Sequence, residues 1–216
     1  MIAIMFNSLS FLWQGLALTL ELSGLVVVIA LVGGLILGLG LCYGPLWIAW
    51  PIRLYSDIVR GLPLLTLIFA IYYGLPVAGV NIGNFWAAMV ALAAFETAHV
   101  SEVARGAIQS IHPGQTDAAK AIGLTFARRV LYVIFPQALR CFLPPWVNTV
   151  VDTVKGSALL SLIGVVDLML AVQQVIGRTF QPMPLYVLGA LIYVAINYTL
   201  SYISRRLEAR YAYIRE

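Results

Sequence analysis

The chain has 216 residues, of which 62% are hydrophobic and 10% are charged. Its mean hydropathy of +0.94 lies far outside the range of soluble domains. The composition therefore predicts an integral membrane protein and leaves no room for a sizeable soluble domain. The net charge of +4 does not indicate nucleic-acid binding, because the cationic residues stand at the ends of apolar runs and form no basic face.

The apolar runs predict an all-α membrane domain over residues 1–216 with five spans. A bilayer core about 30 Å thick requires about 20 mostly apolar residues in a helix. In chain order the predicted spans are 19–43, 56–77, 85–108, 130–154 and 185–204, with a short interfacial stretch at 11–13. Glycines, Asp167 and a glutamine pair interrupt the apolar residues 157–177, which are expected to enter the membrane only partly.

Lysines and arginines are distributed unevenly between the two sides of this predicted bundle. They gather in the first-to-second connection, the third-to-fourth connection and the C-terminal tail: Arg53, Arg60, Arg105, Lys120, Arg128, Arg129, Arg205, Arg206, Arg210 and Arg215. The positive-inside rule then predicts an extracytoplasmic N-terminus and a cytoplasmic C-terminus. The first residues have no basic region and no small-residue cleavage site, so the first helix is expected to stay in the protein.

Gly34 and Gly38 in the first predicted span form a small-xxx-small pair. Such a pair lets another helix approach closely. Glycine is common in membrane helices in any case, so a packing role and a merely compositional origin are both open.

The segment "DAAKAIGLTFARRVLYVIFP", residues 117–136, is the polar exception in this apolar chain. The preceding His-Pro-Gly ends the third helix, because proline lacks the N–H of a helix interior. A short helix at 115–124 is predicted next, with Asp117 in its first turn. Ala118, Ala119 and Ile122 form its small apolar face, Gly123 loosens the chain, and Pro136 marks the next span. That face suits docking into a partner's groove, and an amphipathic interfacial connection is the alternative.

This segment resembles the cytoplasmic loop of permease subunits in binding-protein-dependent ABC importers. "DAAKAIG" followed by "VIFP" is similar to the family's E-A-A-x-x-x-G-x(9)-I-x-L-P motif. Asp117 stands for Glu, Val133 for Ile and Phe135 for Leu, while Pro136 and its spacing from Gly123 are retained.

Three other stretches resemble the polar amino-acid branch of that family. They are "RGLPLLTLIFAIYYGLP", "SEVARGAIQSIHPGQTDAAKAIG" and "FPQALRCFLPPWVNTVVDTVKGSALLSLIG", and the likeness covers about residues 10–212. The resemblance implies the five-helix fold of type I importers, with a loop at about 112–128 that couples to the ATPase. Its coupling residues would be Asp117, Ala118, Ala119, Ile122, Gly123 and Pro136.

Glu96 and His99 stand well inside the third predicted span, one helical turn apart. An ionisable residue at membrane depth is a candidate site. One interpretation is that the two side chains satisfy each other as a buried pair. The other is that Glu96 faces a central cavity and meets a cationic group of the substrate.

Asp152 is the second acid at membrane depth, one turn before Lys155. It either pairs with this lysine or contributes to a substrate site. Leu67 falls where family members line the cavity, although the family commonly has a polar residue there. Two acids without a matching second base favour a basic substrate: arginine, lysine, histidine or a basic opine.

One further acid receives a structural interpretation, and two others receive none. Glu102 lies one turn before Arg105, so a structural ion pair is favoured over a substrate role. Glu21 near the outer end of the first span is left without a role, as is Asp167.

The resemblance implies half of the translocation pathway of an ATP-driven amino-acid importer in the inner membrane. The expected partners are two ATPase subunits, a second permease subunit identical or paralogous to this one, and an extracytoplasmic amino-acid-binding protein. The chain contains no G-x-x-x-x-G-K-[ST] motif, so it is not expected to be an enzyme or to hold ATP, Mg²⁺ or another cofactor. Alternatives are another polar substrate such as glutamine, glutamate or cystine, a membrane enzyme using Glu96 and His99, and a non-transporting adaptor.

Overall fold

A computed structural model describes the backbone of residues 2–212 and the side chains of residues 9–206. Within that range every regular element is helical. The elements are α1 (Ile2–Tyr43), α2 (Leu46–Gly61), α3 (Leu64–Val77), α4 (Asn84–Gln109), α5 (Pro113–Ala121), α6 (Phe126–Arg129), the π turn η1 (Val130–Ile134), α7 (Phe135–Ser157), the 3-10 turn η2 (Ala158–Ile163), α8 (Leu168–Thr179) and α9 (Pro182–Ala212).

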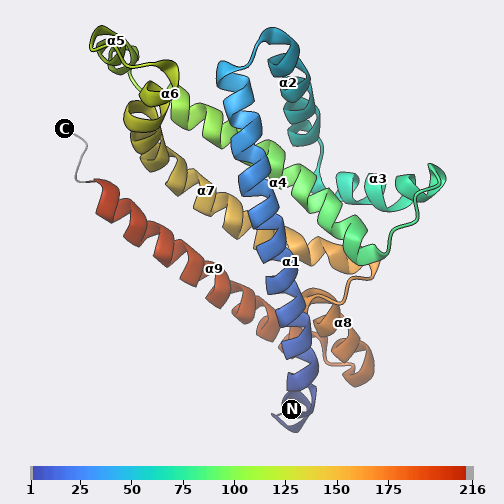
Figure 1. Cartoon of the computed structure of the whole chain (residues 1–216). Coiled ribbons are helices and arrows are strands. Elements are labelled where there is room, and N and C mark those ends of the chain that lie inside the picture. The colour runs from blue at the N-terminus through green and yellow to red at the C-terminus, as the bar shows by residue number, and fades with distance from the viewer. Residues whose placement is uncertain (1, 213–216) are drawn as a thin grey trace.

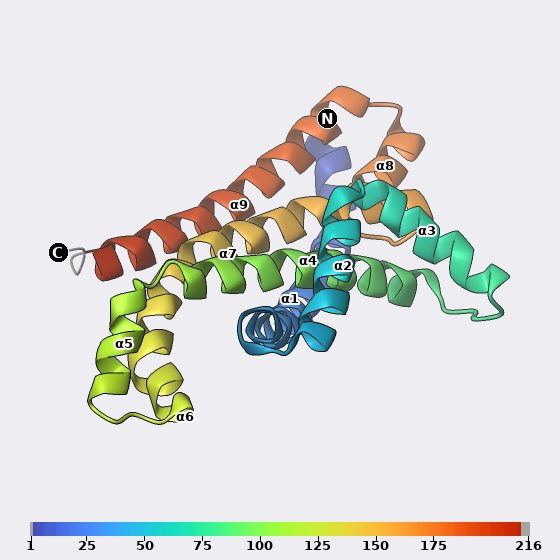
Figure 2. The same cartoon turned by 90° about the horizontal axis from the view of Figure 1, so that it is seen from above.

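The long helices α4, α7 and α9 run side by side, and α1 crosses α4 and α7 at an angle (Figure 1). Figure 2 shows α5 and α6 projecting from one end of the bundle, while α8 lies at the other end. The end of α9 lies on the side of α5, and the start of α1 lies on the opposite side.

In the described residues, four helices are long and apolar enough to cross a membrane. They are Leu9–Tyr43, Asn84–Gln109, Phe126–Ile163 and Pro182–Arg206. These helices correspond to the first, third, fourth and fifth predicted spans and confirm the all-α membrane fold class. The residues predicted as an interfacial stretch, 11–13, are part of the continuous helix α1.

The prediction of the second span as a single helix over residues 56–77 is wrong. Instead α2 and α3 meet at an angle of 107°, and only the bent pair together is long enough to cross. Leu62 has extended backbone angles (φ −92°, ψ 140°) directly before Pro63. The proline ring disfavours helical angles in the preceding residue, so the apolar run folds as two short helices.

The fourth span begins earlier than predicted, because α6, η1 and α7 follow one another without a break. At the start of α7 the N–H of Phe135 donates to the carbonyl of Val130, five residues back. Pro136 follows immediately and has no N–H to donate, so the wider π turn falls where the regular ladder is interrupted. Pro136 therefore lies inside the helix rather than at the beginning of the span.

The predicted broken element at 157–177 is confirmed as η2 and α8, with a turn between them. Gly164 has a left-handed backbone (φ 80°), and the buried Asp167 side chain accepts a hydrogen bond from the N–H of Leu170 (2.9 Å) at the start of α8. The N–H of Leu168 donates to Thr19 Oγ1 (2.9 Å), which ties α8 to α1. With 12 residues, α8 is about 18 Å long and too short to cross a bilayer.

The contact between α1 and α4 depends on Gly34 and Gly38. A Cβ on Gly34 would lie 2.5 Å from the Cβ of Val100, and a Cβ on Gly38 would lie 2.6 Å from that of Ala104. Both distances are shorter than side-chain contacts allow. The structure therefore favours the packing interpretation of this glycine pair.

We predict that Gly34→Val destabilises the protein by about 1–3 kcal/mol, because the added side chain forces α1 away from α4. The melting temperature of the purified transporter should fall by several degrees. Gly24→Val is the matched control, since nothing lies within 4 Å of a Cβ at Gly24 in the same helix. Equal melting temperatures for the two variants would contradict the packing role.

Candidate functional site

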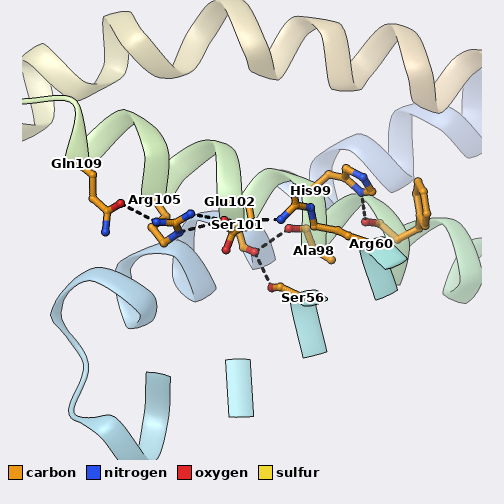
Figure 3. Close-up of polar contacts among 9 residues, drawn as sticks. Ser56, Arg60, Ala98, His99, Ser101, Glu102, Arg105 and Gln109 are labelled. Carbon is orange, nitrogen blue, oxygen red and sulfur yellow. Dashed lines mark hydrogen bonds and ion pairs between the residues drawn. The ribbon is translucent and has the colours of Figure 1, made fainter. Parts of the chain in front are cut away.

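A polar network runs along the α5-side half of α4 and holds the end of α2 (Figure 3). Glu102 accepts hydrogen bonds from Nε and Nη2 of Arg105 at 3.0 and 2.6 Å. Arg60 in the last turn of α2 reaches the same carboxylate at 3.7 Å, and Arg105 also donates to Gln109. The predicted Glu102–Arg105 pair is thus present, and Arg60 joins it across the two helices, which the spacing along α4 could not indicate.

Two buried serines link α2 to the middle of α4. The hydroxyls of Ser56 and Ser101 lie 3.1 Å apart, and Ser101 donates to the carbonyl of Ala98 at 2.8 Å. One helical turn away, the hydroxyl of Tyr55 donates to the carbonyl of Ala94. Sequence analysis did not predict these contacts, because isolated serine and tyrosine residues in apolar helices carry no pattern that identifies their partners.

Glu96 is buried, with 3% of its surface exposed, at the seam between α4 and α7. Thr153 on α7 lies within hydrogen-bonding reach, and Asp152 is close enough for the two charges to interact. In the described part of the chain Glu96 forms no ion pair. A buried carboxylate without a cationic partner is costly.

His99 does not pair with Glu96. Its Nδ1 donates to the carbonyl of Phe95 at 2.9 Å, and its ring lies against the Phe95 ring with the centroids 4.4 Å apart. Of the two interpretations of these residues, the buried Glu96–His99 pair is therefore the one that the contacts of His99 do not support. Among the described residues, no group of three or more His, Cys, Asp or Glu could hold a metal ion.

One side of α7 carries an exposed stripe that contains three polar residues. Its members recur every three or four residues: Cys141, Pro145, Asn148, Asp152 and Lys155. Asp152 and Lys155 form an ion pair of 3.3 Å. Polar and charged side chains at membrane depth do not face lipid without cost, so this stripe borders water or another protein.

Leu67 lies apart from the two acids. It is half-buried on α3, next to the fully buried Ile68, whereas Glu96 and Asp152 lie at the seam of α4 and α7. The helix α3 packs against α4 and η2. The structure thus brings Glu96 and Asp152 together and places Leu67 on a different element.

The predicted short helix at 115–124 is α5, which begins and ends earlier, at Pro113 and Ala121. His112 caps it, because its Nδ1 accepts a hydrogen bond from the N–H of Gly114 at 3.1 Å. Asp117 consequently lies beyond the first turn, contrary to the prediction, and pairs with Lys120 at 3.0 Å.

The apolar residues of α5 do not share one exposed face. Ala119 is buried, with 3% exposed, whereas Ala118 is exposed and Ile122 is 76% exposed. Gly123 ends the helix with a positive φ of 78°; its N–H donates to Lys120, and the N–H of the next residue, Leu124, donates to Ala119. This is a Schellman motif, in which glycine avoids the steric cost of the left-handed conformation.

The structure has helices of membrane-spanning length, a broken second span, a projecting α5 and a polar stripe at membrane depth. Together these features are typical of the permease of a transporter. The sequence matches the family model "Binding-protein-dependent transport system inner membrane component" over residues 30–213. It is 36% identical to the glutamine transport system permease protein GlnP of Escherichia coli, with 91% of each chain covered. It is 35% identical to the arginine transport system permease protein ArtQ of Bacillus subtilis, covering 93% of this chain and 92% of that one.

Solved structures agree with this result. A crystal structure described as an amino acid ABC transporter with histidines matches with a TM-score of 0.90 and 34% identity, covering 95% of this chain and 96% of that one. An inward-facing MetNI methionine ABC transporter has the same fold, with a TM-score of 0.79 and 20% identity over 93% and 96% of the two chains.

The chain belongs to the amino-acid ABC transporter permeases, the inner-membrane components of binding-protein-dependent transport systems. It is a multi-pass inner-membrane protein. It is the permease and not the ATPase of its transporter, and it carries no cofactor of its own. An ATPase subunit and a solute-binding protein are its partners.

We predict that Glu102→Gln lowers the stability of the transporter by about 1–3 kcal/mol, because Arg105 loses its charge-assisted partner. Arg60→Gln should cost less than about 1 kcal/mol, since that pair is longer and its arginine is 40% exposed. Thermal melts of the two purified variants measure the difference. A larger loss for Arg60→Gln would contradict the assigned geometry.

Proposed function

We propose that this permease transports a basic amino acid or a related opine. The observation that carries the proposal is the pair of acids, Glu96 and Asp152, close together at the seam of α4 and α7. With Lys155 opposing one of them, the group retains one net negative charge when both acids are ionised. The guanidinium or ammonium of a basic substrate supplies the missing partner of Glu96.

The stripe on α7 supports a pathway shared with a second permease subunit. Asn148, Asp152 and Lys155 are exposed in this chain although they belong to a spanning helix. A second copy of the chain, or a paralogue, placed against this face would enclose them in a central water-filled pathway. His99 then contributes shape near the site rather than charge, whereas Leu67 on α3 lies apart from the two acids.

The coupling residues act at the α5 end, on the cytoplasmic side of the membrane. Asp117, Ala118 and Ile122 are the exposed members of the set and form the surface that contacts the ATPase. Ala119 is buried and Gly123 ends α5, which packs against η1, and Pro136 directly follows η1. We place the N-terminus outside and the C-terminus in the cytoplasm, with residues 1–216 as one transmembrane domain and two ATPase subunits per pair of permeases.

Neutralising the acids tests the substrate class. Glu96→Gln and Asp152→Asn should each lower uptake of arginine or lysine into vesicles at least tenfold, while the assembled complex is retained. Asp57→Asn serves as control, because Asp57 is an exposed acid on α2 away from the seam. Radiolabelled uptake with competing glutamine measures the specificity. Undiminished uptake of the basic substrate in both variants, or competition by glutamine alone, would overturn the proposal.

A charge on the exposed tip of α5 tests the coupling surface. Ile122→Glu should reduce substrate-stimulated ATPase activity of the reconstituted transporter at least tenfold, because a buried unpaired charge in an interface costs several kcal/mol. Ile122→Leu keeps the apolar contact and should retain the activity. Since the side chain is 76% exposed, neither change should alter the melting temperature of the permease. Full ATPase activity in Ile122→Glu would place the contact elsewhere.

A further inference from the structure

An apolar groove lies between α1, α4 and α7 in the half of the bundle nearest α5. Its volume is about 260 Å³, and hydrophobic side chains from all three helices line it, among them Leu35, Leu39, Ile108, Phe135, Leu139 and Trp146. Leu39 is 44% exposed and Phe135 is 51% exposed, so the groove opens to the surroundings of the protein. Its lining contains no charged side chain.

The groove faces away from the polar stripe on α7. At 3.6 residues per turn, the groove residues Phe135, Phe142 and Trp146 point roughly 120° away from Asn148 and Asp152 around the helix. The polar face requires water or protein beside it, whereas an uncharged groove on another side of the same helix suits hydrocarbon. A second permease subunit seated on the stripe therefore leaves the groove open to the bilayer.

An arginine stands near the end of the groove closest to α5. On α1, Leu31, Leu35, Leu39 and Tyr43 follow one another at intervals of one turn. The ring of Tyr43 meets that of Phe126 edge to face at 5.2 Å, and the guanidinium of Arg129 lies over the Phe126 ring at 5.4 Å. The groove thus ends at an arginine that makes no ion pair in the described part of the chain.

We propose that the groove binds one anionic phospholipid, with an acyl chain between α1 and α7 and its phosphate at Arg129. An arginine presents several N–H donors to phosphate oxygens, and its neighbouring aromatic rings suit the interface between headgroup and chain. The lipid would bridge α1 and α7 near α5 without taking part in substrate binding. The site is independent of the substrate proposed above.

Quenching of Trp146 by brominated lipid tests this site in the complete transporter. Vesicles of phosphatidylcholine receive small amounts of brominated phosphatidylglycerol or, in parallel, brominated phosphatidylcholine. The fluorescence difference between the wild type and Trp146→Phe isolates the tryptophan in the groove from the other tryptophans. We expect this difference signal to be quenched at several-fold lower mole fractions of the brominated phosphatidylglycerol.

Charge variants identify the phosphate contact. Arg129→Gln should abolish the preference for phosphatidylglycerol. Arg205→Gln is the matched control, because Arg205 also lies over an aromatic ring, that of Tyr198 at 5.6 Å, on a different helix. That variant should keep the preference.

Groove variants identify the chain contact. The double variant Leu39→Phe with Leu139→Phe narrows the groove and should reduce the phosphatidylglycerol retained by the detergent-purified transporter in native mass spectrometry. Leu131→Phe, at an exposed apolar position that does not line the groove, should retain it. The proposal would be overturned by equal quenching by the two brominated lipids or by an unchanged preference in Arg129→Gln. It would also be overturned if Trp146 were not quenched at all because protein covers the groove. None of these quenching and mass-spectrometry measurements depends on the uptake of arginine or lysine.

Discussion

The close approach of α1 and α4 constrains the rest of the molecule. Gly34 and Gly38 on α1 lie so close to α4 that an added side chain would clash with Val100 or Ala104. This contact holds α4 along much of its length. At least half of the side chains along the central turns of α4 are consequently buried, polar ones among them. Polar groups on such a helix must find partners within the protein. The serine contact and the Glu102 network provide them toward α2, while Glu96 on the α7 side forms no ion pair in the part of the chain that the structure describes.

The helix that runs from α6 through α7 connects the two functional ends of the fold. It starts beside α5, continues through one π turn and reaches Asp152 and Lys155 without a loop. A displacement of α5 can therefore reach the acidic seam as movement of one helix, because helices transmit motion with little internal deformation. The same helix separates two environments, since its polar stripe and the apolar groove lie on different sides. Under the roles proposed above, one element would serve the pathway, the coupling end and the lipid boundary.

Hydropathy predicted the long helices well, because the bilayer requires length and apolar composition that a sequence displays directly. It failed at Leu62 and Pro63, where the apolar run is uninterrupted. There the proline disfavours helical angles in the preceding residue, and this restriction separates α2 from α3. The Glu102–Arg105 pair was predictable because both residues stand on one helix. Arg60, Ser56 and the capping contact of Asp167 depend on which elements come together or how a turn closes, and periodicity contains no such information. Glu96 and His99 have the spacing of a pair along the helix, yet the ring of His99 contacts Phe95 instead.

The coupling motif separates into residues that shape α5 and residues that α5 presents. Ala119 is small because its position is buried where α5 packs against η1, and a larger side chain there would push the helix away. Gly123 supplies the left-handed backbone that closes the helix. These two positions fix the orientation of α5, and under the proposed coupling role recognition would fall to the exposed Asp117, Ala118 and Ile122. Because Asp117 is already paired with Lys120, the apolar Ile122 is the side chain on this surface that gains most from leaving water on contact with a partner.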